Sequence, residues 1–169
     1  MRALAAGLLS LCLASCASER PGADSLAVME VGLFRLPPGS HTKTIGTCEP
    51  PGPPARHDIA GVPLVMPTTR VPARLGTVFG VKFRPHAGGD AAGVANYRVV
   101  WKVPAPGIGV APNGHVVRDD GCVNSYRIGV ATLEAFRFDR YPEMALGTWT
   151  LEIWSGDRKL MEQPFFVYR

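Results

Sequence analysis

The strongest constraint on the fold is an alternation of apolar and polar residues with a period of two. Near the end of the chain, Trp149, Leu151 and Ile153 stand at every second position. Successive side chains of a strand point to opposite faces of the sheet, so this spacing predicts one buried face and one solvated face. The same alternation occurs at residues 77–84 and 96–103. Together these segments predict an antiparallel sheet that packs on one side.

Weaker strand signals and turn dipeptides extend this all-β pattern. Asn113-Gly114 tolerates the positive φ of a hairpin turn, and Ser155-Gly156-Asp157 predicts a second hairpin. Residues 131–138 are the one segment where a helical turn competes with a strand. We therefore expect about seven or eight strands, which suit a β-sandwich better than a barrel. The weaker candidate strands are residues 26–35, 107–111, 115–118, 126–131 and 160–168.

Residues 36–75 hold nine of the sixteen prolines of the chain. Proline cannot donate to a strand ladder, so this region is predicted to be a Pro-rich loop insertion, with extended and edge segments. Its favoured interpretation is a loop that covers the sandwich. The alternative is a proline-rich ligand for another module.

The N-terminus has the parts of a secretory signal. Arg2 precedes an apolar run over residues 3–13, and Ala14-Ser15 supply small side chains before Cys16. The run is too short to cross a bilayer, which takes about 20 apolar residues. Residues 1–15 are therefore expected to be removed as a signal peptide.

Leu13-Ala14-Ser15-Cys16 also resembles the bacterial lipobox, in which the Cys is acylated and becomes the first mature residue. Several acyl chains such as palmitate hold a protein to a bilayer where one chain is marginal. Ala17 after the Cys implies an outer-membrane lipoprotein that faces the periplasm. Residues 16–25 then form a flexible tether and residues 26–169 a single domain. The alternative, an ordinary signal peptide cut after Ala17, gives a soluble periplasmic protein.

Cys48 and Cys122 are the two thiols that remain after this processing. An even pair in an oxidising compartment predicts a disulfide between them. Its loop of about 75 residues corresponds to roughly 4 kcal/mol in the chain-entropy treatment. Two free buried thiols or half of a metal site are the alternatives.

Two motifs resemble a family of uncharacterised bacterial exported proteins, a domain of unknown function. Residues 69–83 are similar to its signature, in which a Thr and a Pro precede a Leu-Gly-Thr-x-Phe-Gly strand. The family tends to end, as this chain does, with Gly147-x-Trp149, a polar hairpin and Phe165-x-Val167. The resemblance spans most of residues 26–169 and implies an immunoglobulin-like sandwich. It supplies no catalytic residue, and the Pro-rich insertion departs from its pattern.

The sequence shows no catalytic or metal-binding motif. The four histidines never stand at metal-ligand spacing, and solvated surface side chains are their expected state. His115 with Asp119 and Asp120 is the one acid-rich neighbourhood near an imidazole, although Asp119-Asp120-Gly121 is also typical of a turn. We expect no enzyme, no cofactor and no metal. The alternative function is a hydrolase-like enzyme with a site near these three residues.

Two surface features are the candidate partner-binding elements. Trp154 falls on the wet face or at the start of a hairpin, where a large indole indicates a contact; packing on Arg158, Lys159 or a covering loop is the alternative. The second feature is a basic stripe of Lys82, Arg84, Arg98 and Lys102. It forms only if the two strands that carry these residues are neighbours, and the alternative is a solvated face that protects a sheet edge.

These observations predict a lipid-anchored, non-enzymatic binding or envelope-assembly module. Its expected partners are the membrane through the anchor, and an envelope protein or an anionic lipid headgroup. The chain carries a net charge of +4, and no run of basic residues exceeds two. No nucleic-acid partner is therefore expected. Sandwiches host both binding and catalysis, so the fold alone does not decide between them.

Overall fold

Strands make up nearly all the regular structure of the described part of the chain. The computed structural model describes residues 25–37, 62–86, 93–110 and 115–169. A single turn of 3-10 helix spans Tyr141–Glu143. Within these ranges, no helix is long and apolar enough to cross a membrane. The strands are β1 (Ser25–Phe34), β2 (Leu64–Met66), β3 (Arg70–Pro72), β4 (Val78–His86), β5 (Val94–Lys102), β6 (Ile108–Val110), β7 (His115–Val117), β8 (Asp119–Arg127), β9 (Thr132–Arg137), β10 (Gly147–Ser155) and β11 (Arg158–Tyr168).

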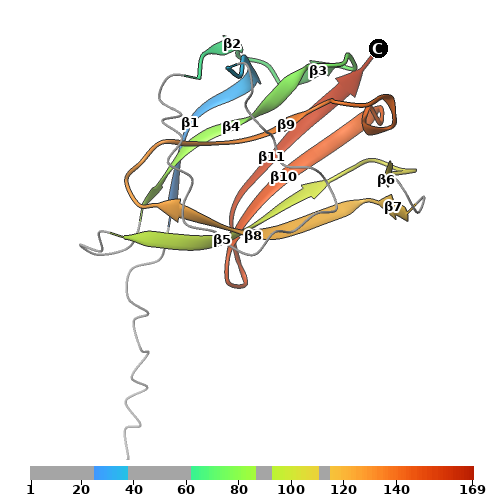
Figure 1. Cartoon of the computed structure of the whole chain (residues 1–169). Helices are drawn as coiled ribbons and strands as arrows, with labels where there is room; N and C mark the ends of the chain where they lie inside the picture. The colour runs from blue at the N-terminus through green and yellow to red at the C-terminus, as the bar shows by residue number, and fades with distance from the viewer. Residues whose placement is uncertain (1–24, 38–61, 87–92, 111–114) are drawn as a thin grey trace, which may run out of the picture.

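Two sheets face each other to form the sandwich (Figure 1). The four-stranded sheet has the order β2-β1-β4-β9, and the five-stranded sheet has the order β3-β11-β10-β5-β8. The hairpin of β6 and β7 forms a separate two-stranded sheet, and Ile108 of β6 packs in the main core. Neighbouring strands are antiparallel, except that β3 runs parallel to β11. The prediction of an all-β sandwich is confirmed.

The strands outnumber the seven or eight that were expected, and two of the additional ones lie in the Pro-rich region. β2 and β3 are three-residue strands at sheet edges. Pro72 ends β3 at such an edge, where a residue without an N–H is tolerated. Residues 38–61, which make up most of the Pro-rich insertion, lie outside the described residues.

Between β7 and β10 one local prediction is wrong, and one open alternative is decided in favour of a strand. Residues 119–127 form strand β8, whereas a turn was expected at its start and a strand only at residues 126–131. Residues 132–137 form β9 rather than a helical turn. β8 pairs with β5 along its whole length, from Asp119 opposite Lys102 to Arg127 opposite Val94. This pairing outweighs the low strand propensity of Asp, Gly and Asn, which is strongly dependent on context.

The core is an aromatic cluster between the sheets, with Phe79 of β4 at its centre. The Phe79 side chain is fully buried. Its ring contacts five other aromatic rings at centroid distances of 5.2 to 5.9 Å. These rings come from both sheets, so Phe79 holds the two layers together. They belong to Trp101, Phe136, Phe138, Trp149 and Phe165.

Two glycines near Phe79, Gly76 and Gly80, are each required for a different structural reason. Gly80 lies opposite Ala135 of β9, and a Cβ placed on it would come within 2.0 Å of the Glu134 carbonyl oxygen. Any larger residue would therefore push β4 and β9 apart. Gly76 has a φ of +79°, a conformation that L side chains rarely adopt. The Leu-Gly-Thr-x-Phe-Gly motif thus encodes a turn, a core residue and a close strand pair.

Candidate interaction face

The four basic residues expected to form one stripe do not lie together. Lys82 and Arg84 belong to β4, whereas Arg98 and Lys102 belong to β5. β4 lies in the four-stranded sheet and β5 in the five-stranded sheet, so the condition for a stripe is not met. The single basic stripe is therefore a wrong prediction.

Lys82 is also not solvated, because the outer face of the four-stranded sheet is covered at this point. Its side chain is 7% exposed, and its Nζ lies 2.6 Å from Oε2 of Glu30. The same Nζ donates a hydrogen bond of 3.0 Å to the carbonyl oxygen of Val62. Val62 forms a small second core with Phe34 and Val78. A buried ammonium needs such partners, so Lys82 has a structural role here.

Trp154 lies on the outer face of the five-stranded sheet, between two cations. The Arg98 Cζ is 4.9 Å from the centroid of the indole, and the Lys159 Nζ is 5.1 Å from it. Arg98 on β5 and Lys159 on β11 both stand opposite Trp154 of β10 in the strand register. The indole Nε1 donates a hydrogen bond of 3.0 Å to Oε2 of Glu152. Trp154 is therefore half-buried and held in one position.

Glu152 is the anion beneath this arrangement, and its side chain is only 4% exposed. Its Oε1 accepts hydrogen bonds from the Nζ of Lys102 at 2.9 Å and the Nζ of Lys159 at 2.8 Å. Burial opposes ionisation of Glu152, but the donors Lys159, Lys102 and Trp154 outweigh it and lower the pKa to about 2. Hydrogen bonds to Glu152 and Glu162 in turn raise the pKa of Lys159. We call Arg98, Lys102, Glu152, Trp154 and Lys159 the Trp154 face.

The structure agrees with the alternative interpretation of Trp154, in which the indole packs on a nearby cation, and its contact with a partner stays a prediction. Lys159 was named for that role, and it lies over the ring. Arg98 was not named, because only the strand order brings β5 beside β10. Glu152 alternates with the core residues Leu151 and Ile153, which gives it to the outer face of β10, but its neighbours bury it.

Of the alternative hydrolase-like site, the structure describes the side chains of Asp119 and Asp120. Asp119 is exposed and Asp120 is 5% exposed, because neighbouring residues of β8 point to opposite faces. The His115 side chain is outside what the structure describes, as are His41 and His57. Among the described residues, no group of three His, Cys, Asp or Glu side chains is arranged to hold a metal ion.

The predicted disulfide and lipid attachment fall largely outside the described residues. Cys122 is buried in β8, opposite Val99 of β5. Cys48 and Cys16 both lie in segments that are not described. The disulfide and the acylation of Cys16 stay predictions.

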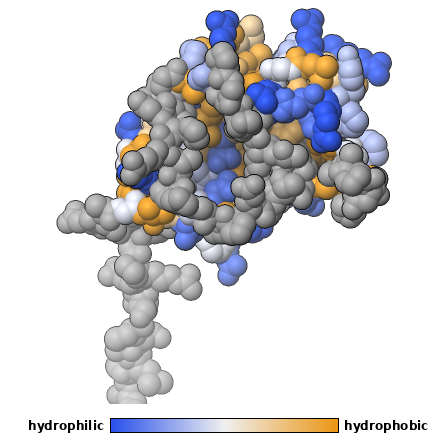
Figure 2. Space-filling view, viewed as in Figure 1, coloured by the Kyte–Doolittle hydropathy of each residue, from blue (hydrophilic) through white to orange (hydrophobic). Residues whose placement is uncertain are grey.

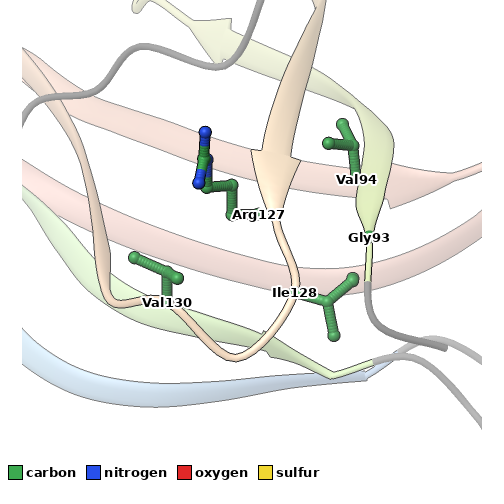
Figure 3. Close-up of a pocket in the computed structure, with 5 residues that line it drawn as sticks. All are labelled: Gly93, Val94, Arg127, Ile128 and Val130. Atoms are coloured by element: carbon green, nitrogen blue, oxygen red, sulfur yellow. The ribbon is translucent and has the colours of Figure 1, made fainter. Parts of the chain in front are cut away.

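A shallow hollow lies at the end of the sandwich where β5 begins and β8 ends (Figure 3). Its described lining is mainly apolar, and Arg127 is the one ionisable residue among these lining residues. The described lining of the hollow presents no pair of acid and base groups. Its lining residues are Gly93, Val94, Arg127, Ile128 and Val130.

Comparison with known proteins assigns the chain to a family. The family model described as a domain of unknown function (DUF3859) matches residues 29–167. The chain belongs to this family. Uncharacterised bacterial proteins were the expected relatives, and the family match agrees with that expectation.

The fold of this DUF3859 domain is similar to that of an immunoglobulin-like protein from Pseudomonas aeruginosa. The crystal structure of that protein superposes with a TM-score of 0.59 at 22% sequence identity, over 85% of this chain and 97% of the other. At this identity the likeness shows the immunoglobulin-like fold alone. No curated protein matches the chain.

Glu152 makes the stability of the DUF3859 domain depend on pH in a defined window. Its folded pKa of about 2 lies below the ordinary value of 4.5, so the ionised carboxylate stabilises the fold above pH 4.5. This contribution, about 3 kcal/mol at most, is lost as the pH falls from 4.5 toward 2. We expect Glu152→Gln to be less stable at pH 7 and to lose less stability on acidification than the parent.

Urea unfolding at pH 7, 5, 3 and 2 measures this difference. Asp157→Asn, a change of an exposed carboxylate in the β10–β11 turn, is the control and should follow the parent. An equal loss of stability in Glu152→Gln and the parent between pH 5 and pH 2 would contradict the assignment.

Proposed function

We propose that this DUF3859 protein is a lipid-anchored, non-enzymatic binding or envelope-assembly module that contacts an acidic partner through its Trp154 face. The observation that carries the proposal is the position of Trp154 between Arg98 and Lys159. A half-buried indole on the outer face of a sheet offers a large contact area. Tryptophan and arginine are the residues most enriched at the energetic centres of protein interfaces.

The charges of the Trp154 face favour a partner with carboxylates or other anionic groups. Glu152 lies beneath the surface, so solvent meets mainly the cations around it. Lys102 has a side chain that is 49% exposed, and Arg98 is exposed as well. A guanidinium that packs on an aromatic ring can still donate two parallel hydrogen bonds from its own edge to one carboxylate. The exposed Glu162 beside Lys159 marks the border of the cationic area.

The same contacts prepare the face for binding. Two cations and a hydrogen bond to Glu152 fix the indole before any partner arrives. Binding then loses little side-chain entropy, which otherwise reduces the affinity of an interface. A rigid anchor residue surrounded by long cationic side chains supports recognition more than catalysis.

The proposed setting is the periplasmic face of the outer membrane. The apolar run before Leu13-Ala14-Ser15-Cys16 supports export and acylation of Cys16 with palmitate-type chains. An oxidising compartment also favours the proposed Cys48–Cys122 disulfide. A soluble periplasmic protein is the alternative if Cys16 is not acylated.

Acylation is tested by replacing its acceptor. We expect Cys16→Ser to abolish lipid attachment, because serine lacks the thiol that receives the diacylglyceryl group. The variant should accumulate as an uncut precursor or as a soluble protein, and mass spectrometry of the mature N-terminus should find lipid only on the parent. A mature parent that begins at Ser18 without lipid would rule out the anchor.

The role of the Trp154 face is tested by photo-crosslinking in intact envelopes. A photoreactive residue at Thr150, on β10 beside this face, should crosslink to a partner. We expect Trp154→Ala to reduce the yield of that crosslink about tenfold or more, because an energetic centre contributes at least this factor to affinity.

Phe166→Ala is the matched control, because Phe166 is an aromatic residue of the same sheet that is 45% exposed. This variant should leave the crosslink unchanged. Yields are compared per folded protein, since Trp154 also packs on its neighbours. An unchanged yield in Trp154→Ala would exclude the Trp154 face as the contact.

A further inference from the structure

We infer that one end of the sandwich is a second membrane contact, which touches the bilayer that holds the lipid anchor. This inference rests on the proposed acylation of Cys16. The surface lies at the end where β1 begins, and its occupant is a bilayer with anionic phospholipid headgroups. We call it the basal tip, and it consists of Arg84, His86, Val94, Arg127, Ile128 and Val130.

Four separate parts of the chain meet at the basal tip (Figure 1). Ser25, the first residue of β1, pairs with His86 at the end of β4. The backbone N–H of Gly129 donates to the carbonyl oxygen of Pro85 at 2.8 Å, and that of Ile128 donates to Gly93 at 2.9 Å. The start of the folded domain thus lies beside the turn that follows β8.

The length of the tether favours this end over the opposite one. Nine residues of chain lead from Cys16 to Ser25, and they span at most about 30 Å when fully extended. Strand β1 has ten residues and carries the chain about 33 Å further to the other end of the sheet. An anchored domain therefore brings the basal tip to the bilayer more readily than the end that carries β2.

The basal tip exposes apolar side chains that the core does not use. Val94 is 53% exposed and Val130 is 50% exposed. The half-buried Ile128 precedes Val130 in the turn after β8, and its backbone N–H donates to Gly93, the residue before Val94. Figure 3 shows all three side chains around the shallow hollow, with Arg127 beside them. Figure 2 shows apolar surface at the end of the molecule where β1 begins. Such residues gain burial when they enter the boundary between headgroups and acyl chains.

The charge of the basal tip suits anionic headgroups. Arg84, His86 and Arg127 are all exposed, and the described residues of the tip include no carboxylate. Asp90 lies in the connection between β4 and β5, outside the described residues. The nearby β10–β11 turn adds Asp157 and Arg158, whose charges offset each other. Basic side chains beside a small apolar patch are typical of a surface that rests on an anionic bilayer.

The contact is tested with tryptophan as a depth probe in the lipidated full chain. Val130→Trp and, as a matched control, Val65→Trp place an indole at opposite ends of the sandwich; Val65 on β2 is 51% exposed. The proteins are reconstituted in vesicles of phosphatidylethanolamine and phosphatidylglycerol whose acyl chains carry bromine, which quenches indole emission on contact. The parent chain gives the emission of its native tryptophans, which is subtracted.

We expect a loss of the Val130→Trp emission and no loss of the Val65→Trp emission. Adding Arg84→Gln and Arg127→Gln to the Val130→Trp chain should restore much of its emission, because the headgroup attraction is lost. Absence of quenching at Val130, or equal quenching at both positions, would overturn the proposal.

A parallel arm separates this proposal from the acylation of Cys16. Residues 1–16 are replaced by a histidine tag bound to a chelating lipid in the same vesicles, so that the chain is attached at the same place without acylation. Quenching of Val130→Trp in this arm supports the basal tip even if mass spectrometry finds no lipid on Cys16. No quenching in this arm overturns it even if Cys16 is acylated.

Discussion

The packing of Phe79 between the two sheets is the interaction on which the rest of this structure depends. Its ring contacts aromatic side chains of β5, β9, β10 and β11, so one residue of the four-stranded sheet joins the central strands of the other layer. Gly80 allows β9 to approach next to it. The motifs that carry the family resemblance lie in this core. They therefore indicate the fold and do not indicate a functional site.

Since the inner faces are committed to the core, the outer faces and the ends of the sandwich are the surfaces open to a partner. On the four-stranded sheet, the buried ammonium of Lys82 pairs with Glu30 and donates to Val62, and these contacts close the outer face. On the five-stranded sheet, the buried Glu152 organises cations around a half-buried indole. On both outer faces, an ion pair thus has one buried partner and one partner that reaches solvent.

The sequence predicted the features that depend on local period, and it missed those that depend on strand order. Alternation placed Trp149, Leu151 and Ile153 in the core, where all three are fully buried. It also placed Lys82 in solvent, because it cannot reveal that Val62 covers this face. The pairing of Arg98 with Trp154 needs β5 beside β10, a neighbour relation that spacing along the chain does not contain.

The free energy of unfolding of Phe79→Ala, measured by urea titration, tests the central role of this residue most directly. Truncating a buried Phe costs about 3–5 kcal/mol, which is a large part of the stability of a single domain. The account predicts a loss of this size, or an unfolded protein, for Phe79→Ala, and a loss well below it for the exposed Phe166→Ala. A Phe79→Ala protein as stable as Phe166→Ala would contradict it.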